Sequence, residues 1–282
     1  MTITSTGTVS RTSGHVVGNL QKNVATGSNV SRTFEVGDAS TYTPVDVVFS
    51  SVSVSGNLTI STTAGDHPNI ATSEIIPARS VNRYWTLAVS GLTYTNYNAT
   101  FNFVSGDVDA GAATGTFEVR RFSGGSWAST TVGTRTPTST QITGTTAVGD
   151  FQVGNVLSVA VSNTVFAFGA QLLNTWLPAQ VSVITNDGTE TETIVGKIST
   201  LTAGASTWAL SSSANGPDQV RAQWSTTGAA GPWTDVSAYD TDFTITTGLA
   251  AGNSVTLYLR IQTPTSTSSI GQFSSTLTVS AQ

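Results

Sequence analysis

Polar and apolar residues alternate with a period of two along most of the chain, in short runs separated by Gly, Asn, Asp, Ser and Pro. In residues 81–89 the odd positions, which include Arg83 and Trp85, fall on one face, because successive side chains of a strand point to opposite sides. Residues 97–104 repeat the pattern, with Tyr97 and Phe101 on the apolar face. Both segments are predicted strands of an antiparallel sheet that buries one face.

The same alternation predicts further strands, and turn residues separate them throughout. They are expected at 45–54, 115–122, 151–161, 220–226, 255–261 and 273–279. No window of a dozen residues has a sustained apolar stripe at helical spacing, and no internal repeat recurs at a fixed spacing. Short strands with frequent turns are typical of a β-sandwich.

A domain boundary is predicted between about residues 163 and 176, where a strong apolar run gives way to Gly169, Ala170 and Gln171 and then to new strands. The length of 282 residues suits two domains of about 140 each. We therefore expect an all-β chain of two tandem antiparallel β-sandwich domains. Their ranges are 14–165 and 166–282, after an N-terminal tract at 1–13.

The composition supports the all-β class. Charged residues make up 10% of the chain, against about 25% in an ordinary domain, whereas the chain contains 50 Thr and 36 Ser. Lysine occurs only at Lys22 and Lys197, which leaves little to cover the surface of helices. A hydrophobic content of 38%, with six Trp and eleven Phe, provides a core and argues against disorder.

Charge and hydropathy exclude two classes of partner. A pI of about 4.8, with no basic run, gives no electrostatic footprint for nucleic acid. The longest nearly apolar stretch, 156–168, is shorter than the roughly 20 residues of a membrane helix. The first residues lack a signal peptide, so we expect an exported form to have lost its leader. The absence of cysteine excludes disulfides and thiolate chemistry.

No motif for a catalytic nucleophile, a zinc helix or a phosphate loop is present, so we assign no catalytic and no cofactor-binding residue and expect no enzyme. His15 and His67 could each act as a base, but a structural role is favoured. Glu190 and Glu192 are the acidic pair considered for glycoside hydrolysis, and they lie in a Thr-rich strand edge.

Two pairs of aspartates are candidate calcium ligands, because alternate residues of an extended chain place two carboxylates on one side. These are Asp107 with Asp109, and Asp240 with Asp242. The alternative, which is favoured, is that Asp and Gly occupy these positions because hairpin turns demand them. No other cofactor is expected.

Trp224 and Trp233 flank a predicted hairpin loop and are candidates for a sugar-binding platform. Packing across neighbouring strands is the favoured alternative, because large aromatic residues stabilise cross-strand neighbours. Arg83, beside Tyr84 and Trp85, is interpreted as an arginine that stacks or pairs near the sheet surface.

Several short motifs occur in order over about residues 14–154. They are Gly14–Leu20, Gly65–Ile70, Val81–Leu87, Ala99–Phe103, Gly106–Gly111 and Val132–Thr136. This half of the chain resembles a β-rich module of large secreted and cell-surface proteins of Bacteroidetes and related bacteria. The resemblance implies an extracellular or cell-surface location.

The second half is similar to immunoglobulin-like modules of bacterial surface proteins. The segments that carry this similarity are Thr207–Leu210, Asp240–Phe243, Val255–Arg260 and Pro264–Ser268. The resemblances imply immunoglobulin-like or jelly-roll-like sandwiches.

The leading functional hypothesis is a non-catalytic extracellular structural protein that associates with itself in a bacterial surface filament or adhesive layer. Low charge reduces repulsion between copies, and strand edges offer backbone groups for pairing. The alternating tract at residues 2–11 is a candidate for a strand donated to another copy. The alternative is a carbohydrate-binding or adhesin module of a secreted protein, with surface glycans as its ligands.

Overall fold

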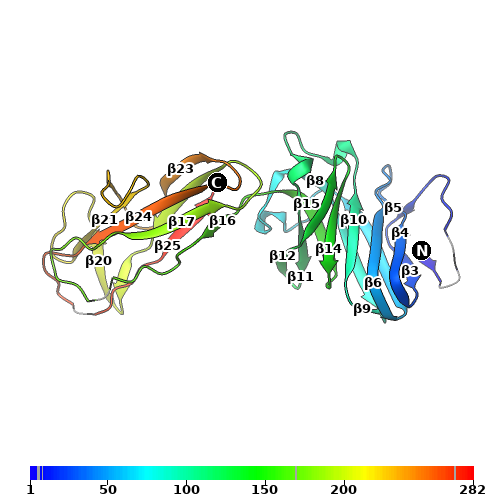
Figure 1. Ribbon diagram of the computed structural model, residues 1–282, viewed down its shortest axis with the longest axis horizontal. Helices are drawn as coiled ribbons and strands as arrows, with labels where there is room; N and C mark the ends of the chain where they lie inside the picture. The colour runs from blue at the N-terminus through cyan, green and yellow to red at the C-terminus, as the bar shows by residue number, and fades with distance from the viewer. Residues whose placement is uncertain (5–6, 8, 169, 270) are drawn as a thin grey trace. The chain divides into compact units, whose positions relative to one another are not determined.

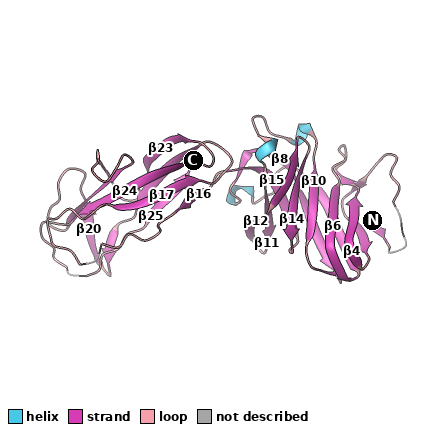
Figure 2. Ribbon diagram, viewed as in Figure 1, coloured by secondary structure: helices cyan, strands magenta, loops and turns pink. Residues whose placement is uncertain are grey.

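The computed structural model describes residues 1–282 except 5, 6, 8, 169 and 270. Strands account for 56% and helices for 3%, so the all-β fold class is confirmed. Contacts divide the chain into two compact units, Met1–Val156 and Leu157–Gln282 (Figure 1). Figure 2 shows the short helical turns in the loops of the first unit; they are η1 (Ile70–Thr72), η2 (Ser105–Asp107) and η3 (Thr114–Thr116).

One layer of the first unit is a seven-stranded sheet with the order β1-β3-β7-β8-β15-β11-β12. Its strands are β1 (Thr2–Ile3), β3 (Leu20–Val24), β7 (Gly56–Ala64), β8 (Ile75–Ser90), β15 (Gly149–Val156), β11 (Glu118–Ser123) and β12 (Ser126–Ser129). All neighbours are antiparallel except β1 and β3, which are parallel. Gly124 and Gly125, both at positive φ, form the tight turn between β11 and β12.

The second layer has the order β13-β14-β10-β6-β4, and β9 pairs with β6. Its strands are β13 (Val132–Thr136), β14 (Ser139–Thr145), β10 (Tyr97–Asn102), β6 (Val45–Val54), β4 (Gly27–Phe34) and β9 (Thr93–Tyr94). A separate parallel pair joins β2 (Val16–Val17) to β5 (Val36–Gly37).

The two layers of the first unit enclose one hydrophobic core, to which both contribute their alternate residues. Trp85 of β8 meets Phe101 of β10 with ring centroids 5.1 Å apart, and Phe151 of β15 contacts Phe101 at the same distance. All three side chains are fully buried. The faces predicted for 81–89 and 97–104 are therefore confirmed.

The second unit contains a larger sheet with the order β16-β17-β24-β21-β20-β19, with β22 beside β21, and a smaller one with the order β23-β18-β25. The strands are β16 (Val159–Val161), β17 (Gln180–Asn186), β24 (Ser254–Gln262), β21 (Gln219–Ser225), β20 (Ser206–Leu210), β19 (Leu201–Ala203), β22 (Thr234–Asp235), β23 (Phe243–Leu249), β18 (Glu192–Ile198) and β25 (Leu277–Ala281).

The core of the second unit consists of two small clusters between these sheets. One contains Ile184, Ile194, Ile245 and Leu257, and the other Ile198, Ala222, Val236 and Leu259. Trp224 packs against both clusters. The second unit therefore relies on a much smaller buried apolar surface than the first.

The predicted strand 151–161 is interrupted at Leu157 and Ser158, and β16 pairs with β17 in the second unit. The interruption has a local cause, because the backbone N–H and the backbone carbonyl of Ser158 are both hydrogen-bonded to other residues of the second unit. Its N–H donates to the buried carboxylate of Glu192 at 2.8 Å, and its carbonyl accepts from Asp187 and Gly188. The units thus divide at 156/157, whereas the sequence places the first module at 14–165.

Two other predicted strands begin later than expected. Residues Thr114–Thr116 form η3, so the strand predicted at 115–122 starts at Glu118. The strand predicted at 273–279 is β25, which starts at Leu277.

Candidate functional site

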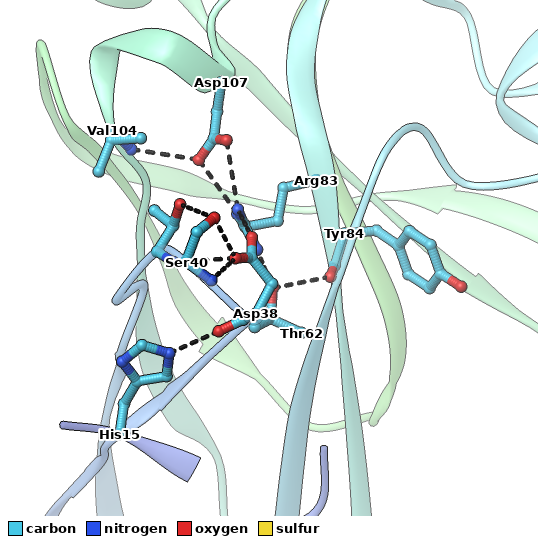
Figure 3. A network of polar contacts seen from close by, with 9 residues as sticks. His15, Asp38, Ser40, Thr62, Arg83, Tyr84, Val104 and Asp107 are labelled. Carbon is cyan, nitrogen blue, oxygen red and sulfur yellow. Dashed lines mark hydrogen bonds and ion pairs between the residues drawn. The ribbon is translucent and has the colours of Figure 1, made fainter. Parts of the chain in front are cut away.

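A network of polar contacts in the first unit surrounds Arg83 of β8 (Figure 3). Alternation along β8 directs Arg83 to the same side as Trp85, and its side chain is 1% exposed. Its Nε and Nη2 donate to the two carboxylate oxygens of Asp107 at 3.1 and 3.2 Å. Nη2 also donates to Asp38 at 2.5 Å, and Nη1 to Thr62 at 3.3 Å. The pairing predicted for Arg83 is present, but its predicted position near the surface is wrong.

Asp38 is the second carboxylate of the network and is held by its own loop. Burial alone would raise the pKa of Asp38, but hydrogen bonds from Arg83, Ser40 and Thr41 outweigh burial and hold this pKa well below its usual value. The backbone carbonyl of Asp38 accepts from His15 Nε2 at 2.6 Å. The network therefore joins β8 to the loop after β5 and to η2, and every nitrogen of the Arg83 guanidinium has a protein partner. It is suited to holding the fold.

The calcium candidates Asp107 and Asp109 are bound to different partners. Asp107 faces Arg83, whereas Asp109 accepts from the backbone N–H of Ser80 at 2.9 Å and from Asn82 Nδ2 at 2.6 Å. Their carboxylates each satisfy groups of β8, which is what a structural role requires.

The other calcium candidates, Asp240 and Asp242, lie in an exposed turn of the second unit. Asp240 has a φ of 52°, in the left-handed region that Asp tolerates in turns. Asp242 lies 4.0 Å from Lys197 Nζ and accepts from Gln282 Nε2 at 3.3 Å. Within the described residues, no group of three or more His, Cys, Asp or Glu side chains is placed to hold a metal ion.

His67 is buried, and both of its ring nitrogens are engaged. The backbone N–H of Asn69 donates to Nδ1 at 3.1 Å, so Nε2 carries the proton and donates to Asp150 at 3.2 Å. Its ring also contacts Tyr84, Phe122 and Trp127. The lone pair that a general base needs is therefore occupied by the loop itself, and His67 holds that loop against the sheet.

The structure places Trp224 and Trp233 on opposite faces of the larger sheet of the second unit. Trp224 pairs with Thr234, so the preceding residue, Trp233, points the other way. Trp224 stacks on Phe243 in the core with ring centroids 5.3 Å apart. The two indoles therefore do not form a shared platform for a sugar.

Trp233 instead lies on the outer face of the sheet, in a stack with Arg260 and Trp176 that the sequence does not reveal. The Arg260 guanidinium lies between two indoles, 4.2 Å from the ring centroid of Trp176 and 4.1 Å from that of Trp233. Arg260 donates to Gln223 Oε1 at 3.0 and 2.6 Å, and Asp235 accepts two hydrogen bonds from Arg221. Alternation could have placed Arg260 and Arg221 on an outer face, but Trp176 is too distant in sequence to be linked to them.

Comparison with known proteins finds no matching family model, no matching curated protein and no matching solved structure. Among the described residues, none of the helices has the length and apolar composition needed to cross a membrane.

Adding a chelator is expected to leave the melting temperature unchanged, because the four candidate aspartates bind protein groups or occupy a turn. Thermal melts with EDTA and with added calcium provide the measurement. A fall in melting temperature with EDTA that calcium reverses would establish a calcium site.

Replacing Arg83 by Met is expected to lower the free energy of unfolding by about 3–5 kcal/mol, because Asp38 and Asp107 lose their buried counter-charge. The depressed pKa of Asp38 adds stability above the usual aspartate pKa, and this stability is lost as pH falls through the folded-state value. R83M should therefore also weaken the acid dependence of unfolding.

Urea denaturation at neutral and acid pH measures both effects for R83M. K197M is the matched control, because Lys197 is exposed and its ion pair is long. Equal stability of R83M and the wild-type protein would contradict the structural role of the network.

Replacing Arg260 by Met is expected to destabilise the second unit by about 1–2 kcal/mol, because it removes the cation from between two indoles. R260K should recover part of the loss, since it restores charge without the planar group that stacks. Denaturation followed by tryptophan fluorescence measures the change. Unaltered stability of R260M would show that the stack of Trp176, Arg260 and Trp233 contributes nothing to stability.

Proposed function

We propose that this protein is a non-catalytic structural subunit of an extracellular filament or adhesive layer, and that it associates with copies of itself through its N-terminal strand. The observation that carries the proposal is the way β1 sits on the sheet. It pairs in parallel with Gln21 and Lys22 of the five-residue strand β3, at the edge of a sheet that is otherwise antiparallel.

Most of the described residues of the N-terminal tract are exposed. Met1 is 65% and Val9 40% exposed, and residues 10–14 are exposed as well. Ser5, Thr6 and Thr8 of the tract lie outside the described residues. A hollow of about 190 Å³ is lined by residues of the tract and of the sandwich, among them Val9, His15, Leu20 and Glu35. Ile3 packs against the hydrophobic core whereas the other described residues of the tract are exposed, so Ile3 is the one described apolar side chain of the tract that release would expose.

Arg11 holds the end of the tract against the sandwich. Its guanidinium carbon lies 3.6 Å from the centroid of the Tyr42 ring, and its Nε donates to the carbonyl of Gly14 at 2.6 Å. The chain before Arg11 can therefore leave β3 while the remainder stays in place. The vacated edge of β3 presents unpaired backbone groups, which the same tract of a second copy can satisfy.

The network around Arg83 supports a structural role in a different way. Arg83 is buried and its two carboxylate partners are partly buried, and these groups are paired with one another, so they stabilise loops rather than face a substrate. A surface rich in Ser and Thr and poor in charge reduces electrostatic repulsion between copies.

Deleting residues 1–11 is expected to abolish self-assembly, because the donated strand is lost. The substitution Ile3→Pro should have the same effect, since it removes the backbone N–H of a residue paired with Lys22. Val9→Pro is the matched control within the tract. Electron microscopy and light scattering of concentrated protein measure assembly, with thermal melts to verify folding.

The expected result is ordered polymers for the wild-type protein and V9P, and monomers for the deletion and I3P. Polymers unchanged by the deletion would refute strand donation. A wild-type protein that stays monomeric at every concentration would refute self-association itself.

A further inference from the structure

A pocket of about 410 Å³ lies on the outer face of the first unit, and none of the residues that line it belongs to the Arg83 network. It is bounded on one side by the loop that contains η1 and on the other by the β11–β12 hairpin. The residues that line it include Thr72, Ser73, Glu74, Arg120, Trp127 and Ser129. Its volume is in the range of pockets that hold small ligands.

The hairpin register explains which side chains reach this pocket. Arg120 pairs with Ser129, and Phe122 pairs with Trp127, so these four residues share one face of the sheet. Val119, on the opposite face, is part of the hydrophobic core. The pocket is therefore built on a rigid sheet surface.

Two contacts hold the loop and the hairpin at a fixed separation. Trp127 Nε1 donates to the carbonyl of Asn69 at 2.9 Å, and Arg120 Nε donates to Glu74 Oε2 at 3.1 Å. Ser73 Oγ donates to the carbonyl of Ile70 and accepts from the backbone N–H of Ile75, which fixes the turn that presents Glu74. The opening between these two contacts is consequently part of the fold.

Two features of the pocket lower the stability of the folded protein. Arg120 is 7% exposed, and its Nη1 has no hydrogen-bond partner among the described residues. Its ion pair with Glu118 Oε2, at 3.6 Å, is longer than a hydrogen bond, and a buried donor without a hydrogen bond costs about 1–3 kcal/mol. Glu74 has a φ of 68°, a left-handed conformation that is unfavourable for this residue type. Unsatisfied donors and backbone strain gather at binding sites, where a ligand makes use of them.

The charges around the pocket decide the class of ligand. The carboxylates of Glu74 and Glu118 are matched by the guanidinium groups of Arg120 and Arg135, with contacts of 3.0 Å for Arg120 to Glu74 and 2.7 Å for Arg135 to Glu118. No net charge is left to attract an ion. What the pocket offers is a mixture of donors and acceptors beside an indole, which suits hydroxyl groups on an apolar ring.

We propose that this pocket binds a neutral sugar ring, whose hydroxyls bond Arg120, Glu74 and Ser129 while its apolar edge contacts Trp127. Glu74, whose side chain is 57% exposed, can accept from a sugar hydroxyl while it stays paired with Arg120. The site is independent of self-association through β1.

Saturation-transfer NMR on the full chain tests the proposal with the methyl pyranosides of glucose, galactose and mannose, and with glucuronate and sulfate for comparison. Ser129→Phe fills the pocket without removing a contact of the fold, and W127A removes the indole. Ser126→Phe, at an exposed position of the same strand that does not line the pocket, is the matched control. Thermal melts establish that each variant is folded.

We expect millimolar binding of at least one neutral pyranoside, weakened at least tenfold by S129F and W127A and unchanged by S126F. The proposal is overturned if no pyranoside binds at tens of millimolar, or if S129F binds as the wild-type protein does. Binding of glucuronate and sulfate alone would also overturn it, because that result would define an anion site.

Discussion

Arg83 occupies a core-facing position of β8, so its guanidinium is a buried cation that other parts of the first unit must neutralise. A buried cation is tolerated only with opposite charges and a complete set of hydrogen bonds. Asp38 lies in the loop after β5, before β8 in the chain, and Asp107 lies in η2, after β8. Satisfying one side chain thus fixes two loops against β8 beside the aromatic core.

The second unit has a different source of stability. Its apolar clusters are small, and part of its aromatic surface is used on the outer face, where Trp176 and Trp233 enclose Arg260. Gln223 links this guanidinium to Asp235, which also binds Arg221. A sheet with little core behind it is stiffened from the solvent side by stacking and charge-assisted hydrogen bonds.

The shortage of charge has a related consequence for function. The charged residues of the first unit largely form ion pairs within that unit. Lys22, one of the two lysines, is itself buried and paired with Glu35. The outer surface is left to hydroxyl and amide groups. Such a surface is suited to pairing of backbone edges and to binding of sugars. Self-association through β1 and sugar binding beside Trp127 both depend on it.

The sequence by itself determined the all-β class, eight of the strand segments, and the buried face of 81–89 and of 97–104, because a period of two assigns every residue to one side of a sheet. It also predicted that Arg83 stacks or pairs. Only the tertiary structure decided which charges meet, that Trp224 and Trp233 face opposite ways, and that Glu74 reaches Arg120 across 46 positions. Alternation is a local property that neighbouring residues impose, whereas partners across sheets and loops depend on strand order and register, which one-dimensional spacing does not contain.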